Sequence, residues 1–165
     1  MYNKSIVNKI RKIIPLERFR HSLAVATLCQ KIASYHKVSE KKAFLAGLLH
    51  DVAKDFSSRK IIGMVRNDPK IKGYKTIPSL HGIAGAEFVK KEFKITDEEV
   101  LNAIAYHVIP QDNPTPLEKI VYIADKLEIN KDFPNRGYYI KLSLQNLDKC
   151  FEEMKKNSKK IKEEK

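Results

Sequence analysis

The chain has 165 residues and a mass of 19.0 kDa, a size that suits one domain and is too short for two ordinary ones. Apolar residues make up 42% and charged residues 32% of the chain, which allows a hydrophobic core and excludes wholesale disorder. The net charge is +12. Because no RNA-binding or helix-turn-helix motif accompanies it, we do not expect a nucleic-acid partner. The charge indicates a solvated lysine-rich surface, with attraction of a polyanionic ligand as the alternative.

The first half of the chain reads as helices separated by short breaks. The apolar spacing predicts helices over residues 3–14 and 18–35, a third from after Ser39 to about residue 50, and a fourth from Ser57 or Ser58 to Val65. Residues 67–78 are rich in breakers and are typical of a loop. A helix over 79–93 follows. Because alternating β-branched runs are missing, the pattern predicts an all-α fold.

The second half continues the helical pattern. Thr96 and Glu99 are spaced as a capping box that opens a helix to about residue 107. Thr115, followed by Pro116 and Glu118, opens another helix to about residue 127. A last helix is expected over 137–155. We expect one domain over 1–165, with its core at about 16–150 and a frayed basic tail at 155–165.

Two further features restrict the class of protein. Cys29 and Cys150 are the only cysteines and lie far apart, which excludes a disulfide framework and a thiolate zinc site. No stretch approaches the ~18 consecutive apolar residues of a membrane span. The charged N-terminal region also lacks the apolar core of a signal peptide. We therefore expect a cytoplasmic protein without membrane contact.

The histidines carry the functional information. Four of the five are predicted to face inward from helices, whereas His36 reads as an ordinary surface histidine. The inward set is His21, His50, His81 and His107. Two acidic residues, Asp51 and Asp125, fall in buried-looking positions beside this set. An unpaired carboxylate there would cost several kcal/mol, so a cation is expected.

A metal ion would satisfy all six groups at once. Imidazoles and carboxylates suit Fe, Mn, Co, Zn or Mg. Six ligands exceed the need of one tetrahedral ion, and two ions sharing a bridging carboxylate suit phosphoester chemistry. A single structural ion, or none, remains the alternative at this point.

The order His21, His50-Asp51, His81, His107, Asp125 resembles the HD-domain metal-dependent phosphohydrolases. Longer local matches resemble their YqeK-type branch, the symmetrical bis(5'-nucleosyl)-tetraphosphatases. These matches are RFRHSLAVA (18–26), AGLLHDVAK (46–54), LHGIAGAEF (80–88), EEVLNAIAYH (98–107) and LEKIVYIADKLE (117–128). The resemblance implies a single helical HD-domain bundle and a homodimer. It also implies cleavage of a dinucleoside tetraphosphate, such as diadenosine tetraphosphate, at its centre into two nucleoside diphosphates.

The resemblance further implies a division of the ligands between two divalent ions. His21, His50, Asp51 and Asp125 would hold the first ion, and His81 and His107 the second, with Asp51 bridging. In the family the ions are commonly iron, and Mn, Co, Mg or Zn would also suit the ligands. The implied catalytic residues are Asp51, Lys54, His81 and His107.

Basic residues near these ligands are expected to bind the substrate. Lys54, three residues after Asp51, is the expected cation for the scissile phosphate, and Arg18 and Arg20 are expected on the outer phosphates. Glu128 is expected to orient a ligand. Lys131 stands where the family has an arginine. It lies in segment 129–137, which differs from the Pro-Gly-Arg run of the family, and segment 108–116 also differs from the family pattern. Two rival functions stay open: another HD-type nucleotide hydrolase or phosphodiesterase, and a non-catalytic nucleotide or RNA binder with a structural metal.

Overall fold

A computed structural model describes residues 4–72, 74 and 76–163, and over this part of the chain it is helical with no strand, which confirms the all-α prediction. The helices are α1 (Lys4–Ile13), α2 (Leu16–Tyr35), α3 (Glu40–Leu49), α4 (Ser58–Val65), α5 (His81–Phe93), α6 (Glu98–Ala105), α7 (Pro116–Leu127), α8 (Arg136–Gln145) and α9 (Leu147–Glu163). Two short 3₁₀ helices, η1 (Pro69–Ile71) and η2 (Ile77–Leu80), lie between α4 and α5. No helix in the described ranges is long and apolar enough to cross a membrane.

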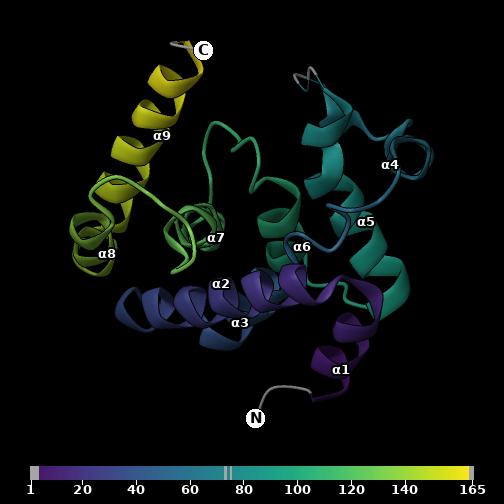
Figure 1. The fold of residues 1–165 in the computed structure, drawn as a ribbon, viewed down its shortest axis with the longest axis horizontal. Coiled ribbons are helices and arrows are strands. Elements are labelled where there is room, and N and C mark those ends of the chain that lie inside the picture. Colours follow the sequence, from purple (N-terminus) through teal and green to yellow (C-terminus); the bar gives the residue numbers. More distant parts are fainter. Residues whose placement is uncertain (1–3, 73, 75, 164–165) are drawn as a thin grey trace.

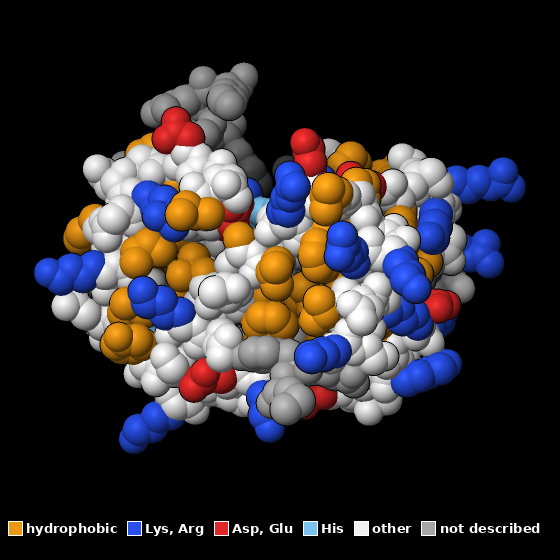
Figure 2. Space-filling view, turned by 60° about the horizontal axis from the view of Figure 1, so that its bottom comes forward, with side chains coloured by type: hydrophobic (Ala, Val, Ile, Leu, Met, Phe, Trp, Pro, Cys, Tyr) orange, Lys and Arg blue, Asp and Glu red, His pale blue; other side chains and the backbone are white. Residues whose placement is uncertain are grey.

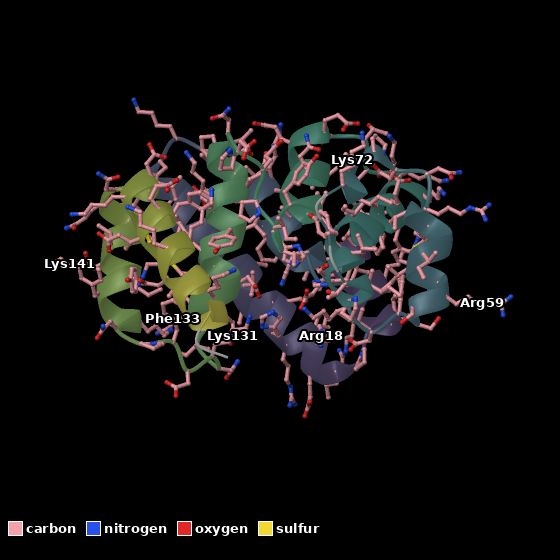
Figure 3. The ribbon with its side chains drawn as sticks, turned by 90° about the horizontal axis from the view of Figure 1, so that it is seen from above. Arg18, Arg59, Lys72, Lys131, Phe133 and Lys141 are labelled. Atoms are coloured by element: carbon pink, nitrogen blue, oxygen red, sulfur yellow. The ribbon has the colours of Figure 1, made fainter. Side chains whose placement is uncertain are left out.

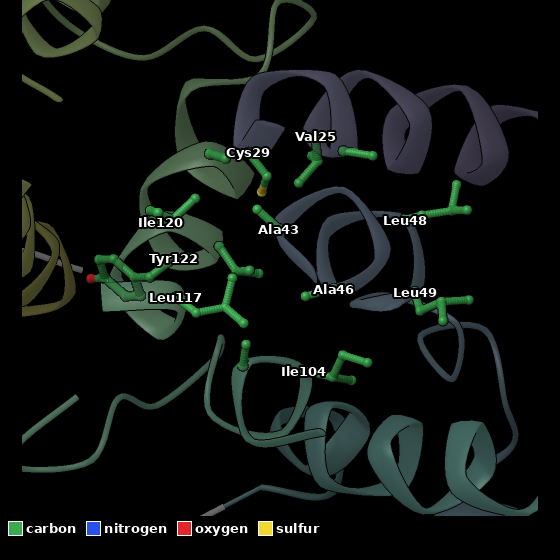
Figure 4. Close-up of a cluster of buried hydrophobic side chains, with 14 of the residues drawn as sticks. Val25, Cys29, Ala43, Ala46, Leu48, Leu49, Ile104, Leu117, Ile120 and Tyr122 are labelled. Carbon is green, nitrogen blue, oxygen red and sulfur yellow. The ribbon is translucent and has the colours of Figure 1, made fainter. Parts of the chain in front are cut away.

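Four helices form the centre of the bundle. α3 packs against α2, α6 and α7, and α7 also packs against α2 and α6. Helices α4 and α5 lie on one side of this centre, and α8 and α9 lie on the other (Figure 1). The apolar side chains of the central four helices meet in one buried cluster (Figure 4). Burial of this surface, at roughly 25 cal/mol per Å² of apolar area, is the main force that holds the bundle together.

Small residues let α2 and α3 approach each other closely. A Cβ atom on Gly47 of α3 would lie 2.8 Å from Cα of Ala26 and 2.9 Å from Sγ of Cys29, both on α2. Contacts this short do not occur, so only glycine fits at this crossing. Cys29 is buried at the same contact and, like the buried Cys150, is a free thiol, as the sequence predicts.

Helix starts follow the predicted capping chemistry at most positions. Ser39 and Ser57 accept hydrogen bonds at the starts of α3 and α4, and Thr115 and Glu118 form the predicted capping box of α7. The capping box predicted for α6 is wrong by one residue. Asp97, rather than Thr96, is the N-cap, and its carboxylate accepts from the backbone of Glu99 and Val100.

The predicted last helix is two helices. Asn146 interrupts the chain with an extended backbone, and its side chain accepts from the backbone N–H of Lys149 at the start of α9. Asparagine competes for backbone donors in this way, which is why it favours caps over helix interiors. α9 then continues to Glu163, eight residues beyond the predicted end at 155. Residues 164 and 165 of the expected frayed tail lie outside the described residues.

Basic side chains are spread over the surface. Figure 2 shows lysines and arginines scattered across most of the visible face, with hydrophobic side chains exposed between them. Several are paired locally, as Lys42 is with Asp97 and Glu99. This distribution agrees with a solvated lysine-rich surface rather than a single basic stripe.

Candidate metal centre

Six side chains from five separate segments of the sequence meet between α2, α3, α5, α6 and α7. His21 lies in α2, and His50 and Asp51 directly follow α3. His81 is the first residue of α5, His107 lies two residues after α6, and Asp125 lies in the last turn of α7. The structure therefore brings together all six residues that the sequence analysis selected as metal ligands. The predicted helix ends differ, because α5 begins at His81 and α6 ends before His107.

Three of the histidines are oriented by their own backbone. The Nδ1 atoms of His50, His81 and His107 each lie 2.7 Å from the carbonyl oxygen three residues earlier in the chain. These carbonyls belong to Gly47, Pro78 and Ile104. A carbonyl only accepts, so Nδ1 carries the proton and donates it. In the neutral ring Nε2 then has a free lone pair, and in each case it faces the other ligands.

His21 is oriented by a side chain instead. Its Nδ1 atom lies 3.0 Å from Oε2 of Glu128, which comes from the other end of the sequence. Glu128 is only 2% exposed. Burial raises the pKa of Glu128, but hydrogen bonds from His21 and Asn130 outweigh that effect and leave the pKa below its ordinary value. The ionised carboxylate accepts from Nδ1, which leaves Nε2 of His21 without a proton and puts Glu128 in contact with a predicted metal ligand.

Asp51 stands between two pairs of histidines. Its Oδ2 atom lies 3.8 Å from Nε2 of His21 and 3.7 Å from Nε2 of His50. Its Oδ1 atom lies 3.0 Å from Nε2 of His81 and 3.4 Å from Nε2 of His107. Each carboxylate oxygen therefore faces its own pair of imidazoles, which is the arrangement of a bridging ligand.

Two ligand groups result from this arrangement. The first ligand group is His21, His50, Asp51 and Asp125, and the second ligand group is Asp51, His81 and His107. The ligand atoms of His21, His50 and Asp51, and those of the second group, lie within 4.8 Å of one another. Oδ1 of Asp125 completes the first group at 3.3 Å from His21 Nε2 and 3.4 Å from His50 Nε2.

The chemistry of these groups fits bound cations. The Nε2 atoms of His21 and His50 are 3.3 Å apart, and those of His81 and His107 are 3.1 Å apart. Two lone pairs cannot face each other at this distance without a proton or a metal ion between them. Imidazole nitrogens with carboxylate oxygens are suitable ligands for Fe, Mn, Co or Zn.

The charges of the ligands agree with this fit. Burial raises the pKa values of Asp51 and Asp125, but the neighbouring histidines outweigh it and hold both well below their ordinary range. Burial lowers the pKa of His107 to about 4, so this ring is neutral near neutral pH. Burial also lowers the pKa of His50, but Asp51 and Asp125 raise it by more.

Glycine brings the two histidines of the second ligand group together. A Cβ atom on Gly82, the residue after His81, would lie 2.6 Å from the carbonyl oxygen of Ala105 and 3.2 Å from Nδ1 of His107. The start of α5 can therefore contact the end of α6 only with glycine at this position. The sequence analysis did not assign Gly82 a role, since the contact depends on how two helices cross.

Three basic side chains surround the ligands. Arg18 lies with Nη1 3.0 Å from Oδ2 of Asp51, Lys54 with Nζ 3.2 Å from Nε2 of His81, and Lys131 with Nζ 2.7 Å from Oδ1 of Asp125. Arg18 and Lys131 lie near each other at one edge in Figure 3, where Arg59 and Lys141 project at opposite ends. Figure 2 shows histidine surface in a hollow flanked by basic and acidic side chains. The side chains of Arg18, Lys54 and Lys131 are 27%, 41% and 41% exposed, so solvent reaches all three.

Two positions near the centre differ from expectation. Asp55, which the sequence analysis missed, accepts from Nε and Nη2 of Arg18 at 3.2 and 3.3 Å. Its only sequence signal is its spacing of four residues from Asp51. Arg20 is exposed on α2, and no hydrogen bond or ion pair joins it to the described residues of the centre. Its expected contact with substrate stays a prediction.

Comparisons with known proteins place this centre in a family. The HD domain model matches residues 18–130, which includes all six ligands. A "probable nicotinate-nucleotide adenylyltransferase/Ap4A hydrolase" of Mycoplasma genitalium is 34% identical over 126 residues, 76% of this chain and 36% of that protein. A "bis(5'-nucleosyl)-tetraphosphatase, symmetrical" of Staphylococcus aureus is 36% identical over 126 residues, 73% of this chain and 63% of that protein.

A solved structure gives the same result for the fold. The crystal structure of a protein described as a "predicted HD superfamily hydrolase involved in NAD metabolism" from Clostridium acetobutylicum superposes with a TM-score of 0.86 at 32% identity. The match covers 98% of this chain and 87% of that one. This chain spans between about a third and two thirds of the length of the two curated relatives above. On the family match and these similarities, the chain belongs to the HD domain family.

Proposed function

We propose that this chain hydrolyses dinucleoside tetraphosphates, diadenosine tetraphosphate among them, symmetrically into two nucleoside diphosphates. The observation that carries the proposal is the position of Asp51, whose two oxygens face two separate pairs of histidines. The names of the two curated relatives, both of which include hydrolysis of this class of substrate, support the same choice.

The proposal assigns one divalent ion to each ligand group. His21, His50, Asp51 and Asp125 would hold the first ion, and Asp51, His81 and His107 the second. Iron is the metal that the family resemblance implies, and Mn, Co, Mg or Zn would also suit these ligands. Such ions activate water and neutralise charge on phosphate oxygens.

The basic side chains are positioned to bind a long polyphosphate. Lys54 lies beside His81 in the second ligand group, Lys131 lies beside Asp125 in the first, and Arg18 contacts Asp51 between them. A substrate whose scissile bond lay at Asp51 would thus have a cation on each side of that bond. This arrangement supports cleavage at the centre of a tetraphosphate. The departing nucleoside diphosphate needs little protonation, because a phosphate is already a good leaving group.

Product analysis tests the proposal. Purified protein is incubated anaerobically with diadenosine tetraphosphate and Fe²⁺, Mn²⁺ or Co²⁺, and the nucleotides are separated. ADP as the only product is the expected result. AMP with ATP would contradict symmetrical cleavage, and absence of turnover with every metal would contradict the activity. In the latter case nucleoside monophosphates, cyclic nucleotides and guanosine tetraphosphate are the next substrates. Metal-dependent melting without turnover of any of them would indicate a binding protein.

Matched variants test the roles of the cations. Lys131→Met is compared with Lys141→Met, and Arg18→Met with Arg59→Met, because the second member of each pair projects far from the centre (Figure 3). We expect KM to rise in Lys131→Met and Arg18→Met only. An equal change in KM for both members of a pair would contradict the proposed substrate contact of Lys131 or of Arg18. The homodimer stays a separate prediction, which light scattering tests.

A further inference from the structure

The turn that follows α7 holds the carboxylate of Glu128 from one side. The backbone N–H of Asn130 donates to Oε1 of Glu128 at 2.6 Å, and the side-chain amide Nδ2 of Asn130 donates to the same oxygen at 2.5 Å. The backbone N–H of Lys131 donates to the carbonyl of Glu128 at 3.0 Å and closes the turn. Both of the Asn130 donors are therefore directed at a single oxygen of Glu128.

This leaves the second oxygen of Glu128 for His21. Oε2 lies 3.0 Å from Nδ1 of His21, and no other described residue donates a hydrogen bond to Oε2. His50, His81 and His107 use backbone carbonyls at this position, and a carbonyl within a formed helix end cannot rotate. A glutamate side chain has three rotatable bonds and can take several rotamers. The Glu128 side chain, which orients His21, therefore needs a contact that restrains its own rotamer.

Glu128 is 2% exposed, so bulk solvent does not supply that restraint. The amide of Asn130 supplies it from the surface side, since Asn130 itself is exposed while its donors reach inward. If this bond is lost, Oε1 keeps the backbone donor alone and the carboxylate gains freedom to turn. His21 would then lose the fixed acceptor that keeps its proton on Nδ1.

We infer that Asn130 is a positioning residue of the metal centre, which acts through Glu128 to hold Nε2 of His21 free and directed at Asp51 and Asp125. The inference rests on the metal binding in the proposed function, and it is independent of which phosphate compound the protein cleaves. It concerns the first ligand group alone, because the second ligand group contains no histidine that is anchored by a side chain.

The first test reads the His21 ring directly in metal-free protein. Long-range ¹⁵N–¹H spectra at about pH 8, where ordinary imidazoles are neutral, report which nitrogen of each ring carries the proton. We expect the proton of His21 on Nδ1 in the natural chain and a mixture of both tautomers in Asn130→Ala. His107, anchored on a carbonyl, should be unchanged in both proteins. An unchanged His21 spectrum in Asn130→Ala would overturn the inference.

The second test measures metal affinity by titration with Co²⁺. Loss of a residue that supports a metal ligand typically lowers metal affinity about 10- to 100-fold. Asn130 is one contact further from the metal than Glu128, so we expect Asn130→Ala to lower the affinity for one of the two ions about 10-fold. Glu128→Gln, whose amide would donate to His21, should weaken the same ion more. Adding Asn130→Ala to Glu128→Gln should then have no further effect. Additive losses in the double variant would contradict action through Glu128.

A control separates positioning from general stability. Asn146→Ala removes the cap of α9 and should lower the melting temperature, since caps contribute about 1 kcal/mol, with Co²⁺ affinity unchanged. A loss of Co²⁺ affinity in Asn146→Ala equal to that in Asn130→Ala would also overturn the inference. The proposed function can fail separately. If the natural chain binds Co²⁺ and Asn130→Ala changes the His21 tautomer, but the natural chain cleaves no dinucleoside tetraphosphate, then the proposed function is refuted and the role of Asn130 stands.

Discussion

The two ligand groups hold their histidines by different means. In the second group, His81 and His107 are both fixed by carbonyls three residues back, at helix ends that form locally. In the first group, His50 is fixed in the same way, but His21 depends on Glu128 and hence on the packing of α2 against α7. The comparison teaches that local backbone sets the orientation of both imidazoles in the second group, whereas that of His21 in the first group depends on a tertiary contact. Variants can test this difference.

The largest effect is expected where the two groups share a ligand. Asp51→Ala removes the carboxylate that faces both pairs of histidines, so both ions should be lost together. Since residues that only support a ligand are worth about 10- to 100-fold, we expect turnover to fall by more than about 100-fold. Metal content and hydrolysis rate are the measurements. A folded variant that keeps both ions and full activity would contradict the bridging role.

A backbone clash should weaken the helix contact that brings the histidines of the second group together. Gly82→Ala places a Cβ 2.6 Å from the carbonyl oxygen of Ala105, which we expect to destabilise the fold by about 1–3 kcal/mol, as overpacking does. Gly63→Ala is the matched control, since nothing lies within 4 Å of a Cβ there and alanine should stabilise α4 by about 0.5–1 kcal/mol. Urea denaturation measures both. If Gly82→Ala were as stable as the natural chain, the close contact of α5 with α6 would be refuted.

Acid should separate the two groups. A protonated imidazole has no lone pair for a metal, so binding must displace any proton present. The pKa of His50 lies above its ordinary value and that of His107 at about 4. As pH falls through the raised pKa of His50, Co²⁺ affinity in the first group should drop by about tenfold per unit, while His107 stays neutral until about pH 4. Co²⁺ titrations at several pH values test this. Loss of both ions at one midpoint would contradict it.

The smallest effect is expected at the histidine outside both groups. His36 is half-buried and its Nε2 lies 2.6 Å from the carbonyl oxygen of Ser143, so the prediction of an ordinary surface histidine is wrong. This bond joins the end of α2 to α8. We expect His36→Ala to cost about 1 kcal/mol of stability and to leave metal affinity and turnover unchanged. A change in either would link His36 to the centre.

The sequence predicts those features that depend on local spacing. The capping residues Ser39 and Thr115 correctly predicted the starts of α3 and α7. The order of histidines and acids predicted all six side chains that meet at the candidate centre. The break at Asn146 was missed, because apolar periodicity continues across it while the side chain prefers a cap. Asp55 and Asn130 were missed as well. Their roles depend on which atoms face each other after the helices have packed, and no spacing rule contains that information.

Gly47 serves two purposes with a single residue. Its missing Cβ lets α3 lie against the backbone of α2, and its carbonyl orients His50. Any movement that opens this helix pair therefore also separates His50 from His21 on α2, two of the predicted metal ligands. Stability and metal binding are consequently inherited together at this crossing. A substitution that loosened the α2–α3 contact would thus be expected to lower the stability of the fold and the proposed metal affinity together.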